Sequence, residues 1–314
     1  MLSQELPDPR DPRPLRRRRP PRPRGKQALA QLSLNLAEKL SGKKYFGVEY
    51  DLPDTDEPRY GWTKPPHGKL AQLLAGRRDA IRVVIALVEK YGAELSRLGR
   101  ESSQSEPLWD QPWFTGISAA VLYAFLRERD PAHMIEIGSG NSTLFAARAI
   151  RDGHLRTKLT SIDPQPRAEV DAVCDEIIRA PFESIHPDRF SALEAGDIVL
   201  VDSSHYALMN SDVTAFFMDA LPRIPARVLI GVHDIFIPDD YPWWLAERRY
   251  SEQYMLATTL LAGHERFDIV MADHFAATDP ELRQELDRAW ERIGLGDVLA
   301  YGSCFWFEPK VVGG

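Results

Sequence analysis

The stretch MIEIGSGNST, residues 134–143, passes from an apolar run through an acid into two glycines and three small polar residues. A short apolar run before Gly-x-Gly is typical of a buried strand that turns tightly into a helix, because glycine tolerates backbone conformations that a Cβ forbids. Asn141 or Ser142 can cap that helix with a side-chain oxygen. We therefore predict a strand, its turn and the start of its helix, at the edge where open parallel sheets bind ligands.

Short apolar segments recur along the chain on both sides of this turn. They predict strands at 133–138, 158–163, 175–180, 197–202, 227–233, 267–272 and 303–308. Helical patterns separate the first five, and a further helix is expected at 117–128. Strands that alternate with helices indicate an α/β fold, in which helices cover both faces of a parallel sheet.

The chain before residue 106 consists of two kinds of segment, a basic tail and a helical region. Residues 1–26 contain nine Lys or Arg and three Asp or Glu, are rich in proline and have no apolar periodicity. Such a segment cannot bury a core, which predicts a disordered basic Pro/Arg-rich tail. Apolar steps of three and four then predict a short helix that stops at Gly42 and one long amphipathic helix from Leu70 to Leu98. The expected organisation is a tail (1–26), a helical N-terminal region (27–105) and a main domain (106–314).

Charge and composition limit the kinds of partner. The formal net charge is −7 and the tail contributes +6, so the remaining residues carry −7 − 6 = −13. An acidic body argues against nucleic acid as the main ligand. No apolar run approaches the ~20 residues that span a bilayer, and the N-terminus lacks an apolar secretion segment. With two cysteines in no paired spacing, we expect a cytoplasmic protein without a membrane partner; homo-oligomer formation is left open.

The residues around the glycine turn indicate which ligand it holds. A dinucleotide fingerprint needs a third glycine at position 143, where this chain has Thr143, and a phosphate loop of the Walker type needs a lysine that is absent here. Glu136 would repel a pyrophosphate but suits a cation. Asp163 follows ~27 residues later, at the end of the second strand, where an acid accepts hydrogen bonds from a ribose diol. Together they favour a positively charged nucleoside, S-adenosylmethionine; the alternative is that Gly-x-Gly only packs a helix on a strand.

Six segments, in this order, are similar to the class I S-adenosylmethionine-dependent methyltransferases, and most to a bacterial subgroup of small-molecule and sugar O-methyltransferases. They are RYGWTKPPH, IEIGSGNST, IDPQPR, GDIVLVDSSH, HDIFIPDDYP and YSEQYML, within residues 58–275. The resemblance implies a Rossmann-like, seven-stranded, mostly parallel sheet whose last two strands form an antiparallel edge pair, behind an N-terminal helical appendage. It implies that residues 106–314 bind S-adenosylmethionine and transfer its methyl group.

The resemblance also implies a set of cofactor contacts. The expected cofactor-binding residues are Glu136, Gly138, Ser139, Gly140, Ser142, Asp163, Glu183 and Asp202. Glu136 and the glycines would line the methionine end, Asp163 would bind the ribose, and adenine would lie near Pro181–Ser184. Trp113 and Phe114 either close over the site or belong to the core.

The acceptor side is expected where the fourth and fifth strands end, in LVDSSH and VHDIFIPDDYP. These ends supply the densest polar cluster of the chain: Asp202, Ser204, His205, His233, Asp234, Asp239 and Asp240. We predict His233, Asp234 and His205 as catalytic residues, because a histidine suits the removal of a hydroxyl proton. Similar macrocin-type sugar O-methyltransferases hold magnesium at these strand ends, so Asp202, His233 and Asp234 are the candidate ligands for Mg²⁺ or another divalent cation. His233 stands where such enzymes have a further aspartate, and Ser204 where some have an acid that acts as base, so these two positions argue against the metal and against that base. The alternative for His205 and His233 is a structural role.

The sequence thus favours an S-adenosylmethionine-dependent methyltransferase that O-methylates a sugar or another small metabolite. The residues that follow the fifth strand could form an acceptor wall or a packing face: Trp243, Trp244, Arg248, Tyr250, Glu252 and Tyr254. Two other functions stay open. One is a nicotinamide-dependent oxidoreductase, which Thr143 disfavours. The other is a non-catalytic cofactor-binding module, which the polar cluster disfavours.

Overall fold

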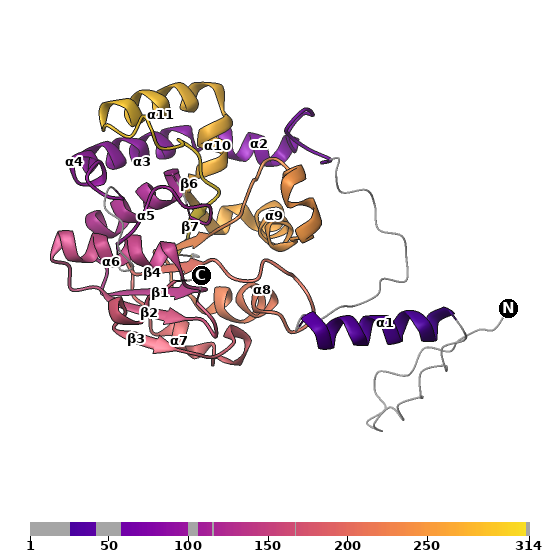
Figure 1. Ribbon diagram of the computed structural model, residues 1–314. Coiled ribbons are helices and arrows are strands. Elements are labelled where there is room, and N and C mark those ends of the chain that lie inside the picture. Colours follow the sequence, from indigo (N-terminus) through magenta and orange to yellow (C-terminus); the bar gives the residue numbers. More distant parts are fainter. Residues whose placement is uncertain (1–25, 42–57, 100–105, 115, 167, 312–314) are drawn as a thin grey trace. The chain divides into compact units, whose positions relative to one another are not determined.

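A computed structural model describes residues 26–41, 58–99, 106–114, 116–166 and 168–311 (Figure 1). The chain divides into two compact units, residues 1–54 and 55–314. In the first, α1 (Lys26–Ser41) is the expected short helix before Gly42. Residues 1–25, which make up nearly all of the predicted tail, lie outside the described residues. In the described parts of the chain, no helix has the length and apolar character that crossing a bilayer requires.

A seven-stranded sheet forms the centre of the second unit. Its strands are β1 (His133–Ile137), β2 (Lys158–Ile162), β3 (Glu176–Ile178), β4 (Ile198–Val201), β5 (Leu229–Val232), β6 (Phe267–Ala272) and β7 (Phe305–Pro309). Their order is β3-β2-β1-β4-β5-β7-β6. The first five strands are parallel, and β7 pairs antiparallel with both β5 and β6. The predicted seven-stranded, mostly parallel sheet with an antiparallel edge pair is confirmed.

Helices and short helical turns connect these strands. The helices are α2 (Gly68–Ala75), α3 (Arg78–Lys90), α4 (Gly92–Leu95), α5 (Gly116–Arg129), α6 (Asn141–Gly153), α7 (Asp188–Ser191), α8 (Asp212–Ala215), α9 (Glu252–Gly263), α10 (Asp273–Thr278) and α11 (Pro280–Arg292). The turns η2 (Phe182–Ser184) and η5 (Trp243–Arg248) are used below.

The single long helix expected from Leu70 to Leu98 is wrong, because this segment forms α2, α3 and α4. Gly76 ends α2, and the chain turns again at Tyr91, between α3 and α4. The apolar stripe nevertheless continues through both breaks, with α3 buried against α5, α11 and β6. Periodicity therefore identified the buried face but not the breaks. These helices pack within the same compact unit as the sheet.

The order in which the chain adds strands to the sheet reverses between β1 and β4, which are parallel neighbours. The chain passes from β1 through α6 to β2 on one side, and from β4 through α8 to β5 on the other. Because β-α-β crossovers are right-handed, these opposite directions place α6 and α8 on opposite faces of the sheet. The carboxyl ends of β1 and β4 thus border a crevice, the place where open α/β sheets bind ligands.

The glycine turn is wedged into this crevice. Gly138 has a φ of +80°, and its N–H donates to the Ile162 carbonyl at 3.0 Å. The N–H of Asp202 donates to the Ile137 carbonyl at 2.8 Å, which draws the end of β4 against the turn. A Cβ at position 138 would lie 1.9 Å from the Asp202 carbonyl oxygen. Only glycine fits between β1, β2 and β4 at this position.

Replacing Gly138 by Ala should destabilise the fold more than replacing Gly196 by Ala. Both glycines have positive φ, +80° and +102°, so each substitution costs about 1–2 kcal/mol of backbone strain. A Cβ at Gly196, in the turn before β4, meets nothing within 4 Å. At Gly138 the collision with Asp202 adds about 1–3 kcal/mol, the usual cost of overpacking. Urea unfolding of both variants measures the difference. Equal losses in the free energy of unfolding would contradict the close contact between position 138 and the Asp202 carbonyl.

Candidate active site

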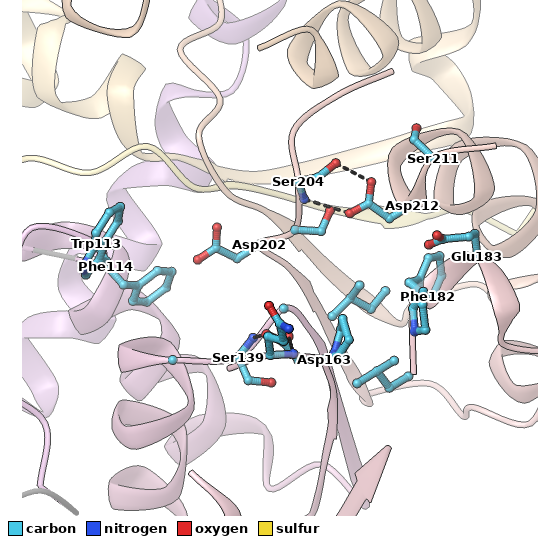
Figure 2. Close-up of a pocket in the computed structure, with 18 of the residues that line it drawn as sticks. Trp113, Phe114, Ser139, Asp163, Phe182, Glu183, Asp202, Ser204, Ser211 and Asp212 are labelled. Carbon is cyan, nitrogen blue, oxygen red and sulfur yellow. Dashed lines mark hydrogen bonds between the residues drawn. The ribbon is translucent and has the colours of Figure 1, made fainter. Parts of the chain in front are cut away.

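A cavity of about 440 Å³ opens at the carboxyl ends of β1, β2 and β4 (Figure 2). Six of the eight expected cofactor-binding residues line it: Gly138, Ser139, Gly140, Asp163, Glu183 and Asp202. Glu183 comes from η2, which follows β3, and Trp113 and Phe114 also contribute to the wall. We call this space the cofactor cavity. Glu136 and Ser142 are not among the residues that line it.

Asp163 is fixed in the cofactor cavity by backbone donors. Its Oδ2 accepts a hydrogen bond from the Ser139 N–H at 2.7 Å, and its Oδ1 accepts one from the Gln165 N–H at 2.7 Å. The first bond ties the end of β2 to the glycine turn. Each carboxylate oxygen keeps capacity for a further donor, so the side chain is held in place for a ligand that carries hydroxyl groups.

Glu136 lies buried behind the cavity wall. The Thr143 hydroxyl donates a hydrogen bond to its Oε2 and accepts one from the Gly140 N–H at 3.0 Å. Its Oε1 is buried and has no hydrogen-bond partner among the described residues. Burial raises the pKa of Glu136 to about 8, although the Ser142 and Thr143 hydroxyls oppose the rise. In this arrangement Glu136 and Ser142 support the turn from within, and Glu136 offers little negative charge at neutral pH.

A network of buried histidines and carboxylates adjoins the cofactor cavity. His205 Nδ1 lies 2.8 Å from Glu252 Oε2, and its Nε2 lies 3.4 Å from Asp202 and 3.5 Å from Asp234. His233 Nδ1 lies 3.3 Å from Asp202 and 3.6 Å from Asp234. Both imidazoles are at least nine-tenths buried. The structure therefore brings all the expected catalytic residues together, with Glu252 added at the start of α9.

The histidines and Asp202 shift one another's pKa values in opposite directions. Burial would lower the pKa values of His205 and His233, but the surrounding carboxylates raise both. Burial would also raise the pKa of Asp202, but His233 and His205 hold it well below its usual range. The carboxylates therefore favour the protonated form of each histidine, and a protonated histidine offsets the repulsion between them. His205 lines neither the cofactor cavity nor the neighbouring cavity that contains His233, which disfavours its expected role as a proton acceptor.

The same arrangement bears on the candidate metal ligands. Asp202 and Asp234 both face the same nitrogen of His233, Nδ1, at 3.3 and 3.6 Å, so the three side chains contact one another directly. No group of three or more His, Cys, Asp or Glu within the described ranges is arranged to hold a metal ion. As they stand, these three residues do not fit a divalent-cation site.

A second cavity, of about 640 Å³, lies on the other side of the network. It is lined by Trp62, Pro112, Trp113, Ser118, His233, Asp234, Phe236, Trp244, Leu245, Arg248, Arg283, Leu299, Tyr301, Gly302 and Ser303. We call it the acceptor cavity. Trp113 lines both cavities, and Asp202 in the first contacts His233 in the second. Two spaces therefore meet at a carboxylate–imidazole pair.

Other members of the expected polar cluster lie elsewhere. Asp239 contacts His274 at 3.0 Å, and Asp240 accepts hydrogen bonds from Arg59 and Tyr254. Ser204 donates to Asp212 through both its N–H and its hydroxyl (Figure 2). Of the expected wall, Trp244 and Arg248 line the acceptor cavity, whereas Trp243, Tyr250, Glu252 and Tyr254 do not.

Sequence reasoning missed Ser303 altogether. Its hydroxyl lies 3.3 Å from His233 Nε2 and donates to Asp234 Oδ1 at 3.2 Å. Ser303 precedes β7, which pairs antiparallel with β5, so the start of β7 reaches the end of β5. An antiparallel last strand was expected. Pairing that strand with the fifth strand in the sequence would have placed Ser303 near His233 and so identified it.

Comparison with known proteins identifies the domain. Residues 135–235 match the family model described as a methyltransferase domain. No curated protein matches the chain.

Solved methyltransferases are similar at low identity. The SAH-bound methyltransferase PaMTH1 of Podospora anserina is 15% identical over 80% of this chain and 100% of its own, with a TM-score of 0.38. An O-methyltransferase from Bacillus cereus in complex with SAH is 12% identical over 73% and 91%, with a TM-score of 0.37. The MycE methyltransferase from the mycinamycin biosynthetic pathway, in complex with Mg and SAH, is 16% identical over 59% and 47%, with a TM-score of 0.31. At these values the three likenesses carry no argument about this chain's metal or acceptor.

The matched segment begins in β1, contains the glycine turn and Asp163, and ends just after Asp234. It therefore covers the strand ends that build the cofactor cavity. The methyltransferase predicted from the glycine turn and its flanking segments is confirmed: residues 135–235 of this chain carry a methyltransferase domain.

Proposed function

We propose that this methyltransferase O-methylates a hydroxyl group of a sugar or another small metabolite. The observation that carries the proposal is the meeting of the two cavities at the Asp202–His233 pair. One cavity adjoins the glycine turn, and the other has aromatic walls that suit the apolar face of a sugar or an aromatic ring. A titratable group stands between them, where a proton must be removed from a hydroxyl.

On this proposal the cofactor cavity binds S-adenosylmethionine. Asp163 accepts hydrogen bonds from the ribose diol, Glu183 lies beside the adenine, and Gly138 and Gly140 let the methionine end approach the backbone. Asp202 lines this cavity and also contacts His233, at 3.3 Å. S-adenosylmethionine bound there would supply the methyl group to the acceptor oxygen and would leave as S-adenosylhomocysteine.

His233 is the proposed general base. It accepts the hydroxyl proton, and Asp202 and Asp234 stabilise the resulting imidazolium. The Ser303 hydroxyl lies 3.3 Å from Nε2 of His233, and this contact helps to fix the plane of the ring. Orientation of the two reactants supplies much of the rate in such a displacement, so rigid walls serve the reaction.

The alternatives are tested with cofactors. Thr143 fills the position of the third fingerprint glycine and joins the turn to Glu136, which disfavours a nicotinamide oxidoreductase. S-adenosylmethionine, and not NAD or NADP, should raise the melting temperature. Transfer of a labelled methyl group to candidate sugars and hydroxylated metabolites tests the reaction. Stabilisation without transfer to any of them would favour a non-catalytic module.

Replacing Asp163 by Ala should weaken S-adenosylmethionine binding by about 1.5–3 kcal/mol, the range for hydrogen bonds to a charged group. Calorimetric titration measures the loss. Since Asp163 also accepts from the Ser139 N–H, the melting temperature of Asp163→Ala without cofactor separates the ribose contact from damage to the turn. Exposed Glu169, six residues further on, provides the control Glu169→Ala, which should bind normally. Unchanged affinity in Asp163→Ala would remove Asp163 from the site.

The methyl-transfer rate should rise with pH, because only neutral His233 can accept a proton. Asp202 and Asp234 raise the pKa of His233, so the midpoint should lie above ~6.5, the ordinary histidine value. The Asp234→Asn variant loses one of these charges, so its midpoint should move down. Asn tolerates the positive φ of +56° at this position.

A midpoint that does not move in Asp234→Asn would count against His233 as the base. A chelator provides a second check on the same assay. A rate that is lost with the chelator and restored by magnesium would instead support a divalent cation among Asp202, His233 and Asp234.

A further inference from the structure

Arg248 stands out among the residues that line the acceptor cavity. It is exposed, ends η5, and donates one hydrogen bond from Nη1 to the Tyr250 hydroxyl at 2.7 Å. Its guanidinium carbon lies 5.7 Å from the centroid of the Trp113 ring and 5.7 Å from that of Tyr250. Two aromatic rings and one hydroxyl therefore hold this cation at the wall of the cavity.

Within the ranges that the structure describes, Arg248 forms no ion pair with a carboxylate. The other arginine of this cavity, Arg283, pairs with Asp287 at 2.8 Å and donates to the Ala277 carbonyl. Arginines that pack the N-terminal helices also have acids, as in the pair Arg78–Asp279. Arg248 is thus held in place by neutral groups, and most of its N–H donors remain available to a ligand.

A guanidinium on aromatic faces is a built receptor for an oxyanion. Its planar set of donors matches the two oxygens of a carboxylate, and its conformation is already fixed by the rings. The position also suits one negative charge better than two. Arg283 is engaged by Asp287, and Asp234 lines the same cavity with a charge of its own. A phosphate monoester would face a single free arginine and a neighbouring carboxylate.

We infer that the methyl acceptor carries a carboxylate, which Arg248 binds while the acceptor's hydroxyl group lies at His233. This rests on the proposed function, because His233, the proposed base, lines the same cavity as Arg248. Aromatic side chains line that cavity as well, with Trp62, Trp113 and Trp244 among them. The substrate class is therefore a hydroxylated ring that bears an acid group.

Calorimetry of the full chain saturated with S-adenosylhomocysteine tests this with matched probes. The pairs are glucuronate against glucose, and 3,4-dihydroxybenzoate against catechol; glucose 6-phosphate is the phosphate probe. In at least one pair the acid should bind about tenfold or more tightly than its neutral partner, because a charge-assisted bond is added. Arg248→Gln should remove that preference, and Arg248→Lys should keep part of it. The matched control is Arg288→Gln on exposed α11, which should keep the preference in full.

Absence of any acid preference in both pairs, or a preference that survives Arg248→Gln, would overturn the inference. Tighter binding of glucose 6-phosphate than of glucuronate, dependent on Arg248, would overturn the choice of carboxylate. The binding measurement does not require methyl transfer. If Arg248-dependent acid binding is found but none of these compounds is methylated, the proposed reaction fails and the carboxylate site stands.

Discussion

Two buried imidazoles between three carboxylates hold the active region of this methyltransferase together. His233 follows β5, Asp202 follows β4, His205 belongs to the loop after β4, and Glu252 begins α9. The network therefore ties two strand ends to a helix that is distant in sequence. Removing one member of a buried pair leaves an uncompensated charge, typically at a cost of about 3–5 kcal/mol. Both cavities share this network as a wall, so their shapes depend on it.

Charge balance within the network also explains the arrangement of the acids. The resemblance in sequence offered Asp202, His233 and Asp234 as ligands of a divalent cation. In the folded chain the carboxylates face the two histidines, whose pKa values they raise. Glu136 shows the complementary case. It has no basic partner and its pKa rises to about 8, so burial favours its neutral form. The pKa values of Asp202 and Glu136 are therefore shifted in opposite directions, because only Asp202 has histidine partners.

The sheet could be predicted closely from the sequence, because strands buried on both faces form short apolar runs that stand out between helices. Observed strands begin and end within about two residues of the predicted ranges. The breaks between α2, α3 and α4 could not be predicted, since the apolar stripe from Leu70 to Leu98 continues across them. The position of Glu136 also differs from the expectation, because this residue does not line the cofactor cavity. Neighbouring strand residues point to opposite faces, and Ile137 lines the cofactor cavity, so Glu136 points away from it.

The sequence predicts the cofactor cavity better than the acceptor cavity. The reason is that the residues of the first are close together in the sequence, whereas those of the second are far apart. Most of the cofactor cavity comes from residues 137–212, where each strand end and its turn are adjacent in sequence, so local motifs reveal it. The acceptor cavity draws on Trp62, residues 112–118, residues 233–248, Arg283 and residues 299–303. Trp62 reaches it because its indole N–H donates to the Asp240 carbonyl at 3.0 Å, and the Asp240 N–H donates to the Tyr60 carbonyl. Such contacts between distant segments set the walls that an acceptor meets, and no local motif records them. Cofactor identity is therefore readable from the sequence of this chain, whereas acceptor specificity depends on the folded arrangement of separate segments.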